Sequence, residues 1–133
     1  MNNVFIDSNI CVYAFDKTDR LRQQKAFEII SMFPFTSSQV IIETYNACYR
    51  KLKLPSEVCE ETAEFLCDIT QVTEITAEVI KNAISLKKKY LLSFLDACIV
   101  ASAFHANCDI LYSEDMQHNL IIENKVTIIN PFI

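Results

Sequence analysis

The stretch Val4-Phe5-Ile6-Asp7-Ser8-Asn9 decides the fold, because a short apolar run ends abruptly in residues that favour a helix start. An apolar run of this length bounded by polar residues is typical of a buried strand. Aspartate is among the best residues to cap a following helix. We therefore predict a strand over residues 3–6, followed at once by a helix that begins near Asp7.

The same alternation of strand and helix continues along the chain. Ser38, Ser56, Thr76 and Ser93 are predicted helix starts, and Pro34, Pro55 and Pro131 separate elements. The predicted strands are residues 35–37, 71–75, 109–112 and 127–130, and the predicted helices are residues 18–32, 38–53, 56–68, 76–89 and 94–106. This order predicts an α/β fold with a parallel sheet covered on both faces. Ligands then bind beyond the carboxyl ends of the strands.

Length and composition limit the possible functions. The chain has 133 residues, of which 51% are hydrophobic, so we expect residues 1–133 to form one domain. The net charge of −5 argues against a protein that coats nucleic acid non-specifically. It is compatible with an enzyme whose acidic cleft holds cations, because bound ions reverse the local charge.

The chain contains no glycine. A P-loop and a dinucleotide-binding fingerprint both need glycines, so these two classes are excluded in their usual forms. Turns with positive φ must use other residues, and asparagine is a usual substitute. The candidates in predicted loops are Asn107, Asn119, Asn124 and Asn130.

Cysteine usage and hydropathy indicate a cytoplasmic, soluble protein. The six cysteines form no C-x-x-C pair and lie among apolar or helical neighbours, so we expect reduced thiols. They are Cys11, Cys48, Cys59, Cys67, Cys98 and Cys108. The N-terminus lacks the features of a signal peptide, and no apolar run is long enough to cross a bilayer.

Four acidic residues lie where this fold would place its chemistry. Asp7 and Asp115 follow predicted strands, whereas Glu43 and Asp96 lie near predicted helix starts. Clustered carboxylates raise one another's pKa, and a magnesium or manganese ion would relieve their repulsion. Such an ion lowers the pKa of a bound water and stabilises charge on a phosphate. The set therefore points to phosphodiester hydrolysis.

Each acid also has a structural explanation when taken alone. Asp7 can be a helix N-cap, Asp96 can complete a capping box with Ser93, and Asp115 can be a turn residue. Glu43 has no comparable explanation. Asp96 precedes an apolar helix face, where a carboxylate needs a partner such as a metal ion or a backbone cap.

Four segments together resemble the motifs of the PIN-domain family, and within it the VapC-like toxins of toxin–antitoxin pairs. They are Val4-Phe5-Ile6-Asp7-Ser8-Asn9, Val40-Ile41-Ile42-Glu43, the segment from Leu95-Asp96-Ala97 to Ala103, and Ile110-Leu111-Tyr112-Ser113-Glu114-Asp115-Met116. The resemblance covers essentially the whole chain, including the closing segment from Val126 to Phe132. The chain departs from the family's pattern where asparagines stand in loops that often carry glycine.

The resemblance implies a three-layer α/β/α sandwich with a short parallel sheet. It implies that Asp7, Glu43, Asp96 and Asp115 converge on one or two Mg²⁺ or Mn²⁺ ions, with Asn9 and Ser113 in supporting roles. It further implies an RNA substrate, a small antitoxin partner that blocks the acidic cleft, and a homodimer.

Binding of RNA requires positively charged side chains, because phosphate contacts dominate affinity for nucleic acids. The candidates are Arg20, Arg22 and Lys25, together with Lys87, Lys88 and Lys89. A third group, Arg50, Lys51 and Lys53, is better explained as a solvated helix end. His105 is expected to be structural, and His118 is not an obvious ligand or base.

Other functions fit the acids less well. An aspartyl phosphatase would need a second aspartate two residues after Asp7, where Asn9 stands. A phospho-receiver domain would need a lysine after the last strand, where Asn130-Pro131 stands. A PIN nuclease of RNA processing that is not a toxin, and a non-catalytic binding module with a structural metal, remain open alternatives.

Overall fold

A six-stranded sheet runs through the computed structural model, which describes residues 3–133. The strand order is β3-β2-β1-β4-β6-β5, and every neighbouring pair is parallel except β5 and β6. The strands are β1 (Val4–Ile6), β2 (Phe35–Ser37), β3 (Gln71–Thr73), β4 (Ile110–Tyr112), β5 (Ile121–Ile122) and β6 (Val126–Ile129). The predicted α/β class with a short, mostly parallel sheet is confirmed.

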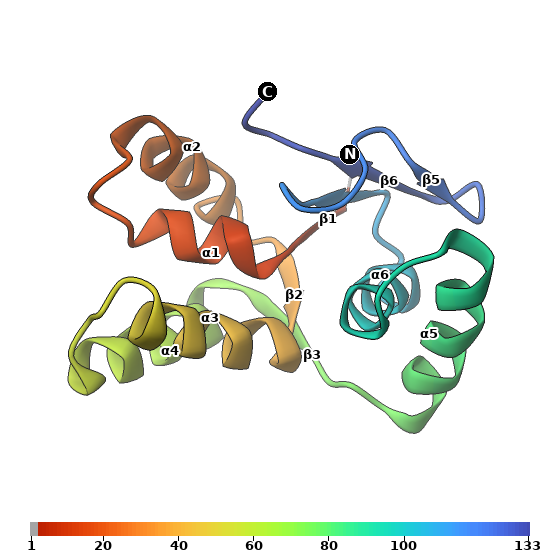
Figure 1. Ribbon diagram of the computed structural model, residues 1–133, viewed down its shortest axis with the longest axis horizontal. Helices are drawn as coiled ribbons and strands as arrows, with labels where there is room; N and C mark the ends of the chain where they lie inside the picture. Colours follow the sequence, from red (N-terminus) through yellow and green to blue (C-terminus); the bar gives the residue numbers. More distant parts are fainter. Residues whose placement is uncertain (1–2) are drawn as a thin grey trace.

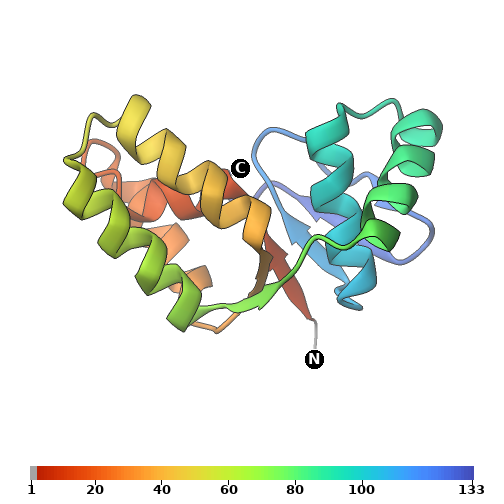
Figure 2. The same ribbon diagram turned by 90° about the horizontal axis from the view of Figure 1, so that it is seen from below.

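Three pairs of packed helices surround the sheet and give the predicted three-layer α/β/α sandwich (Figures 1 and 2). The pairs are α1 (Ser8–Ala14) with α2 (Arg20–Ile30), α3 (Ser38–Arg50) with α4 (Ser56–Ile69), and α5 (Ala77–Tyr90) with α6 (Phe94–His105). Figure 2 shows α1 to α4 in one half of the molecule and α5, α6 and the last strands in the other.

Helix α6 is central to the core, because every residue from Ala97 to Ala103 is buried. It contacts β2, β4 and β6, whose side chains Leu111 and Ile128 are fully buried. A helix that is apolar on all sides is stable only when protein surrounds it. Among residues 3–133, no helix combines the length and the apolar character needed to cross a bilayer.

The predicted elements occur in the predicted order, but one strand was missed and several boundaries were wrong. Strand β5 was missed, because two residues in an antiparallel hairpin leave no periodic signal. The predicted strand 71–75 ends at Thr73, and the predicted helix 18–32 is the shorter α2, which Asp19 caps. The cap of α3 is Ser37 and not Ser38, since the Ser37 hydroxyl accepts the hydrogen bond from Val40 N at 3.3 Å.

The absence of glycine forces other residues into left-handed conformations. Asn107, Asn119 and Asn124 have positive φ, as predicted. Asn130 does not: its side-chain oxygen instead accepts a hydrogen bond from Phe132 N at 2.9 Å. Larger residues also take positive φ, which costs roughly 1–2 kcal/mol each. They are Phe33, Lys53, Leu91 and Glu123.

All six cysteines are free thiols, and only Cys67 is exposed. Burial raises the pKa of the Cys11 and Cys108 thiols to about 12, so these side chains stay neutral and pack as small apolar groups.

The chain reverses its direction across the sheet between β1 and β4. From β1 it proceeds outward through β2 to β3, and it then returns to place β4 on the other side of β1. At such a switch point the loops after the two strands diverge and leave a crevice beyond their carboxyl ends. Asp7 follows β1 and Ser113 follows β4 at this crevice.

Candidate active site

Asp7 is the buried acid of this crevice, with 3% of its surface exposed. It caps α1, and its Oδ1 accepts a hydrogen bond from Ser8 N at 2.6 Å. Its Oδ2 accepts a hydrogen bond from the Ser113 hydroxyl at 2.7 Å. The strands set this contact, because Asp7 N donates to Tyr112 O at 3.0 Å and so aligns the ends of β1 and β4. The N-cap explanation of Asp7 is thus correct, and it does not exclude a further role.

The pKa of Asp7 is raised from 3.8 to about 6. Burial is the largest cause, since it disfavours the charged carboxylate, and the negative charges of Asp96 and Glu43 raise the pKa further. The hydrogen bonds from Ser113 and Ser8 act in the opposite direction. The structure therefore places Asp96 and Glu43 within electrostatic reach of Asp7, although α6 and α3 are far from β1 in sequence.

Asn9 connects Asp7 to Asp115. Its side-chain amide donates to Asp115 Oδ2 at 3.2 Å and to Asp7 Oδ2 at 3.4 Å. Its side-chain oxygen accepts from Glu114 N at 3.2 Å, which holds the chain just before Asp115. Asn9 thus contacts both acids and the backbone between Ser113 and Asp115, and its supporting role stays a prediction.

Glu43 and Asp96 belong to α3 and α6, and their charges act on Asp7 from these two helices. Gln39 joins these two helices, because its amide donates to Glu43 Oε2 at 3.0 Å and to Leu95 O at 3.1 Å. Asp96 lies in the first turn of α6, where its backbone amide donates to the Ser93 hydroxyl at 3.2 Å. Both acids are partly exposed, so their side chains can change rotamer.

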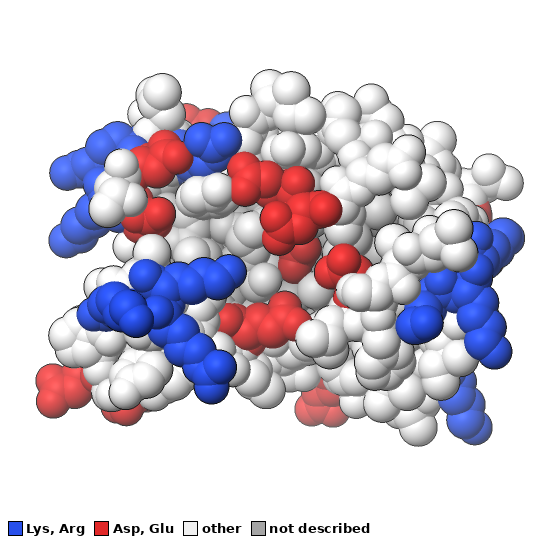
Figure 3. Space-filling view, in the orientation of Figure 1, with Lys and Arg blue, Asp and Glu red and all other residues white. Residues whose placement is uncertain are grey.

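Figure 3 shows acidic side chains gathered in a hollow near the centre of one face, with lysines and arginines toward its margins. Within residues 3–133, no three histidine, cysteine or acidic side chains lie close enough together to hold one ion in this arrangement. Repulsion between carboxylates favours such a separation. The oxygen-only donors and the raised pKa of Asp7 nevertheless fit a hard divalent cation such as Mg²⁺ or Mn²⁺.

The basic candidates divide into engaged and free side chains. Arg22 forms ion pairs with Asp19 at 3.0 Å and with Glu114 at 3.2 Å, and Lys89 pairs with Glu123 at 2.7 Å. Both side chains are therefore engaged in ion pairs within the chain. The candidates without an ion pair among the described residues, all of them exposed, are Arg20, Lys25, Lys87 and Lys88.

The histidines lie outside the acidic hydrogen-bond network. His105 stacks edge-on against Phe104, as expected for a structural residue. His118 Nδ1 accepts from Asn130 N at 2.9 Å, so its proton is on Nε2 when the ring is neutral. Three partners of the site were not predicted from the sequence: Gln39, Tyr13 and Glu114. Gln39 alone had a local signal, since it precedes Glu43 by one helical turn.

The comparison with known families agrees with this geometry. The sequence profile described as the PIN domain matches residues 4–121. The chain belongs to the PIN-domain family. No curated protein matches it in sequence.

Several solved structures share this PIN-domain fold. VapC20 of Mycobacterium tuberculosis, a toxin that cleaves the sarcin–ricin loop, is 20% identical with a TM-score of 0.71, covering 85% of this chain and 90% of its own. A toxin–antitoxin complex from Klebsiella pneumoniae gives 17% identity and a TM-score of 0.72, covering 97% and 98%. VapBC2 of Rickettsia felis, bound to a promoter DNA fragment, gives 17% identity and a TM-score of 0.69, covering 96% and 98%.

Proposed function

We propose that this PIN-domain protein is a metal-dependent endoribonuclease that hydrolyses RNA phosphodiesters with Mg²⁺ or Mn²⁺. The observation that carries the proposal is the buried Asp7 at the switch point, whose pKa is raised to about 6 by burial and by the charges of Asp96 and Glu43. Keeping several acids around one crevice is unfavourable without a compensating cation. Perturbed acids in a cleft are accordingly candidates for function.

Each acid has a proposed role. Asp7, Asp96 and Asp115 would hold the metal directly or through water, and Glu43 would be a further ligand or position the attacking water. When bound, the metal lowers the pKa of its water and stabilises charge on the phosphate. Ser113 keeps the Asp7 carboxylate oriented through its 2.7 Å hydrogen bond. Asn9 keeps Asp115 beside Asp7.

We further propose that the enzyme is the toxin of a toxin–antitoxin pair, acts in the cytoplasm and forms a homodimer. The similar folds of VapC20 and of two toxin–antitoxin complexes support the toxin role. A small antitoxin needs apolar surface, and α2 and α4 expose Leu21, Phe27, Val58 and Phe65. Phe27 and Val58 also line a groove of about 660 Å³ between the α1–α2 and α3–α4 turns.

The test is cleavage of end-labelled total RNA by purified protein with Mg²⁺, with Mn²⁺ and with EDTA. The variant Asp96→Asn removes one charge from the crevice, and Asp68→Asn removes one from the exposed end of α4 as a matched control. We expect cleavage that needs metal, is lost in Asp96→Asn and is unchanged in Asp68→Asn. Cleavage by folded Asp96→Asn at the wild-type rate would reject the assignment, and no cleavage by wild type would favour the binding module.

The toxin role is tested by expression in a bacterial host. Wild-type protein should arrest growth, whereas Asp96→Asn at the same level should not. Normal growth with an active, expressed enzyme would favour the alternative, a PIN nuclease of RNA processing.

A charge-reversal series tests the RNA contacts. We expect Arg20→Glu and Lys88→Glu to weaken RNA binding and to lower the salt slope by about one phosphate contact each. An unchanged affinity and slope would remove these residues from the interface.

A further inference from the structure

The loop that carries Asp115 has little backbone support. It runs as a series of bends from Glu114 to Met116. Ser113 N donates to Ile129 O at 3.0 Å, and Asn119 N donates to Ile128 O at 2.7 Å. Between them, the amides of residues 115–118 donate no hydrogen bond to any residue in the range 3–133. A loop with so few backbone bonds is mobile unless side chains hold it.

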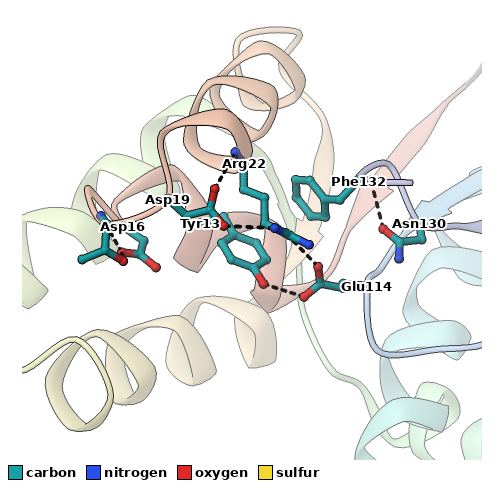
Figure 4. A network of polar contacts seen from close by, with 8 residues as sticks. Tyr13, Asp16, Asp19, Arg22, Glu114, Asn130 and Phe132 are labelled. Atoms are coloured by element: carbon teal, nitrogen blue, oxygen red, sulfur yellow. Dashed lines mark hydrogen bonds and ion pairs between the residues drawn. The ribbon is translucent and has the colours of Figure 1, made fainter.

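Side chains from α1 and α2 hold this loop through Glu114 (Figure 4). The Tyr13 hydroxyl donates to Glu114 Oε1 at 2.6 Å, and Arg22 Nε donates to Oε2 at 3.2 Å. Both carboxylate oxygens are therefore engaged, and only 24% of the Glu114 side chain is exposed.

Arg22 is itself fixed on several sides. Its guanidinium lies 5.5 Å from the centre of the Tyr13 ring and 5.7 Å from that of Phe132. The two rings pack edge to face with their centres 5.0 Å apart, and Asp19 forms an ion pair with Arg22 at 3.0 Å. Holding a long side chain in one place costs entropy, and here the rings and Asp19 have already restricted it before Glu114 binds.

We propose that Tyr13, Arg22 and Glu114 form a latch that positions Asp115 beside Asp7. The three residues of the latch are positioning residues. The Glu114 carboxylate accepts hydrogen bonds from Tyr13 on α1 and Arg22 on α2, and Glu114 acts on Asp115 only because the two residues are adjacent in the backbone. The metal-binding part of the inference rests on the proposed function. Partners that orient metal ligands commonly change metal affinity or activity by about 10- to 100-fold when they are removed.

The chain contains a second group with the same chemistry, which serves as a control. Glu123 accepts from Lys89 at 2.7 Å and from the Tyr90 hydroxyl at 3.2 Å. It joins the end of α5 to the β5–β6 turn, at the opposite end of the molecule from α1 and α2 (Figure 1). The hydrogen bonds of this group join its own members, and none of them reaches Asp7, Glu43, Asp96 or Asp115.

The experiment compares Tyr13→Phe and Glu114→Ala with Tyr90→Phe and Glu123→Ala. Tyr13→Phe removes one hydroxyl and keeps the ring that contacts Arg22 and Phe132, so it should leave the fold intact. The first readout is ¹⁵N relaxation of the metal-free protein at Asp115. The second is Mn²⁺ affinity, measured from the free-ion signal in electron paramagnetic resonance.

We expect both latch variants to lower the order parameter of the Asp115 amide from about 0.85 toward 0.6 or less. We expect both to weaken Mn²⁺ binding about tenfold, with no change in the two control variants. Unchanged relaxation in Tyr13→Phe and Glu114→Ala would overturn the latch. Loss of Mn²⁺ binding in Glu114→Ala alone would also overturn it, because Glu114 would then be a ligand. If wild type binds no Mn²⁺, the proposed function fails and relaxation alone decides on the latch.

Discussion

The two sides of the acidic crevice are built differently. On the β1–β4 side, Asp7 and Asp115 are linked by Asn9, and Asp7 also accepts hydrogen bonds from Ser8 and Ser113. On the α3–α6 side, Glu43 accepts a single side-chain hydrogen bond, from Gln39. The first side is densely bonded, whereas the second is not.

The difference follows from the secondary-structure elements that carry the acids of each side. Strands β1 and β4 are adjacent and parallel, so backbone hydrogen bonds fix Asp7 and Ser113, the first residue after each strand. Helices α3 and α6 belong to different helical pairs, and the Gln39 amide bridges them near the acids. We infer that the β1–β4 side is preorganised, and that side-chain rotation of Glu43 and Asp96 completes the site when a cation binds.

The largest effect is expected from Asp7→Asn. Cleavage should fall at least about 100-fold, because a neutral amide cannot replace a carboxylate as a ligand for a hard cation. The variant should nevertheless be more stable at pH 8 by about 1–3 kcal/mol, since it no longer buries a charge. RNA cleavage in the presence of Mg²⁺ measures the first effect, and urea unfolding in EDTA measures the second. A less stable Asp7→Asn would show that burial of this acid is not unfavourable.

The stability difference between Asp7→Asn and wild type should depend on pH. The pKa of Asp7 in the folded protein, about 6, lies above its ordinary value of 3.8. Between these values the folded state binds the proton more tightly, so the unfolding free energy of wild type falls as pH rises. The advantage of the variant should therefore be small at pH 4 and full above pH 6 to 7. A pH-independent difference would contradict the raised pKa.

Ser113→Ala tests the bonding of the β1–β4 side with a smaller change. Its hydroxyl lowers the pKa of Asp7, so its removal should raise that pKa further and move the acid limb of the cleavage profile to higher pH. Cleavage at neutral pH should fall about tenfold. Ser102→Ala is the matched control, because that buried hydroxyl donates to Cys98 O at 2.9 Å. An unshifted limb would remove Ser113 from the site.

Gln39→Ala should have the smallest effect, about two- to threefold on cleavage. A glutamine–acid pair one helical turn apart contributes only about 0.2–0.5 kcal/mol. The control is Gln71→Ala, which removes another amide that bridges two segments, at Phe33 O. A loss as large as that of Ser113→Ala would mean that the α3–α6 side is as preorganised as the other.

Most of the fold was predictable from local patterns. Buried strands followed by capping residues gave the order of the elements and the edge where Asp7 and Asp115 lie. The two-residue β5 and the positive φ of Phe33 and Leu91 were not predictable, since tertiary packing rather than local preference determines them.

The sequence indicates where the four acids, Asn9 and Ser113 lie, but it does not indicate their further partners Gln39, Tyr13 and Glu114. The acids follow strands or begin helices, where the fold restricts their place. Tyr13 and Arg22, in contrast, meet Glu114 across 101 and 92 residues of sequence. Nothing in the local sequence marks such a contact, and only the packing of α1 and α2 beside the Asp115 loop creates it.

The most direct test is Mn²⁺ binding by the folded protein with one acid removed from each side of the crevice. Electron paramagnetic resonance of wild type, Asp7→Asn, Asp96→Asn and the exposed control Asp68→Asn measures it. If the two sides share one ion, Asp7→Asn and Asp96→Asn should each weaken binding at least about tenfold, with Asp68→Asn unchanged. Wild-type affinity in Asp96→Asn would show that the α3–α6 side does not hold the ion, and would contradict a site built from both sides.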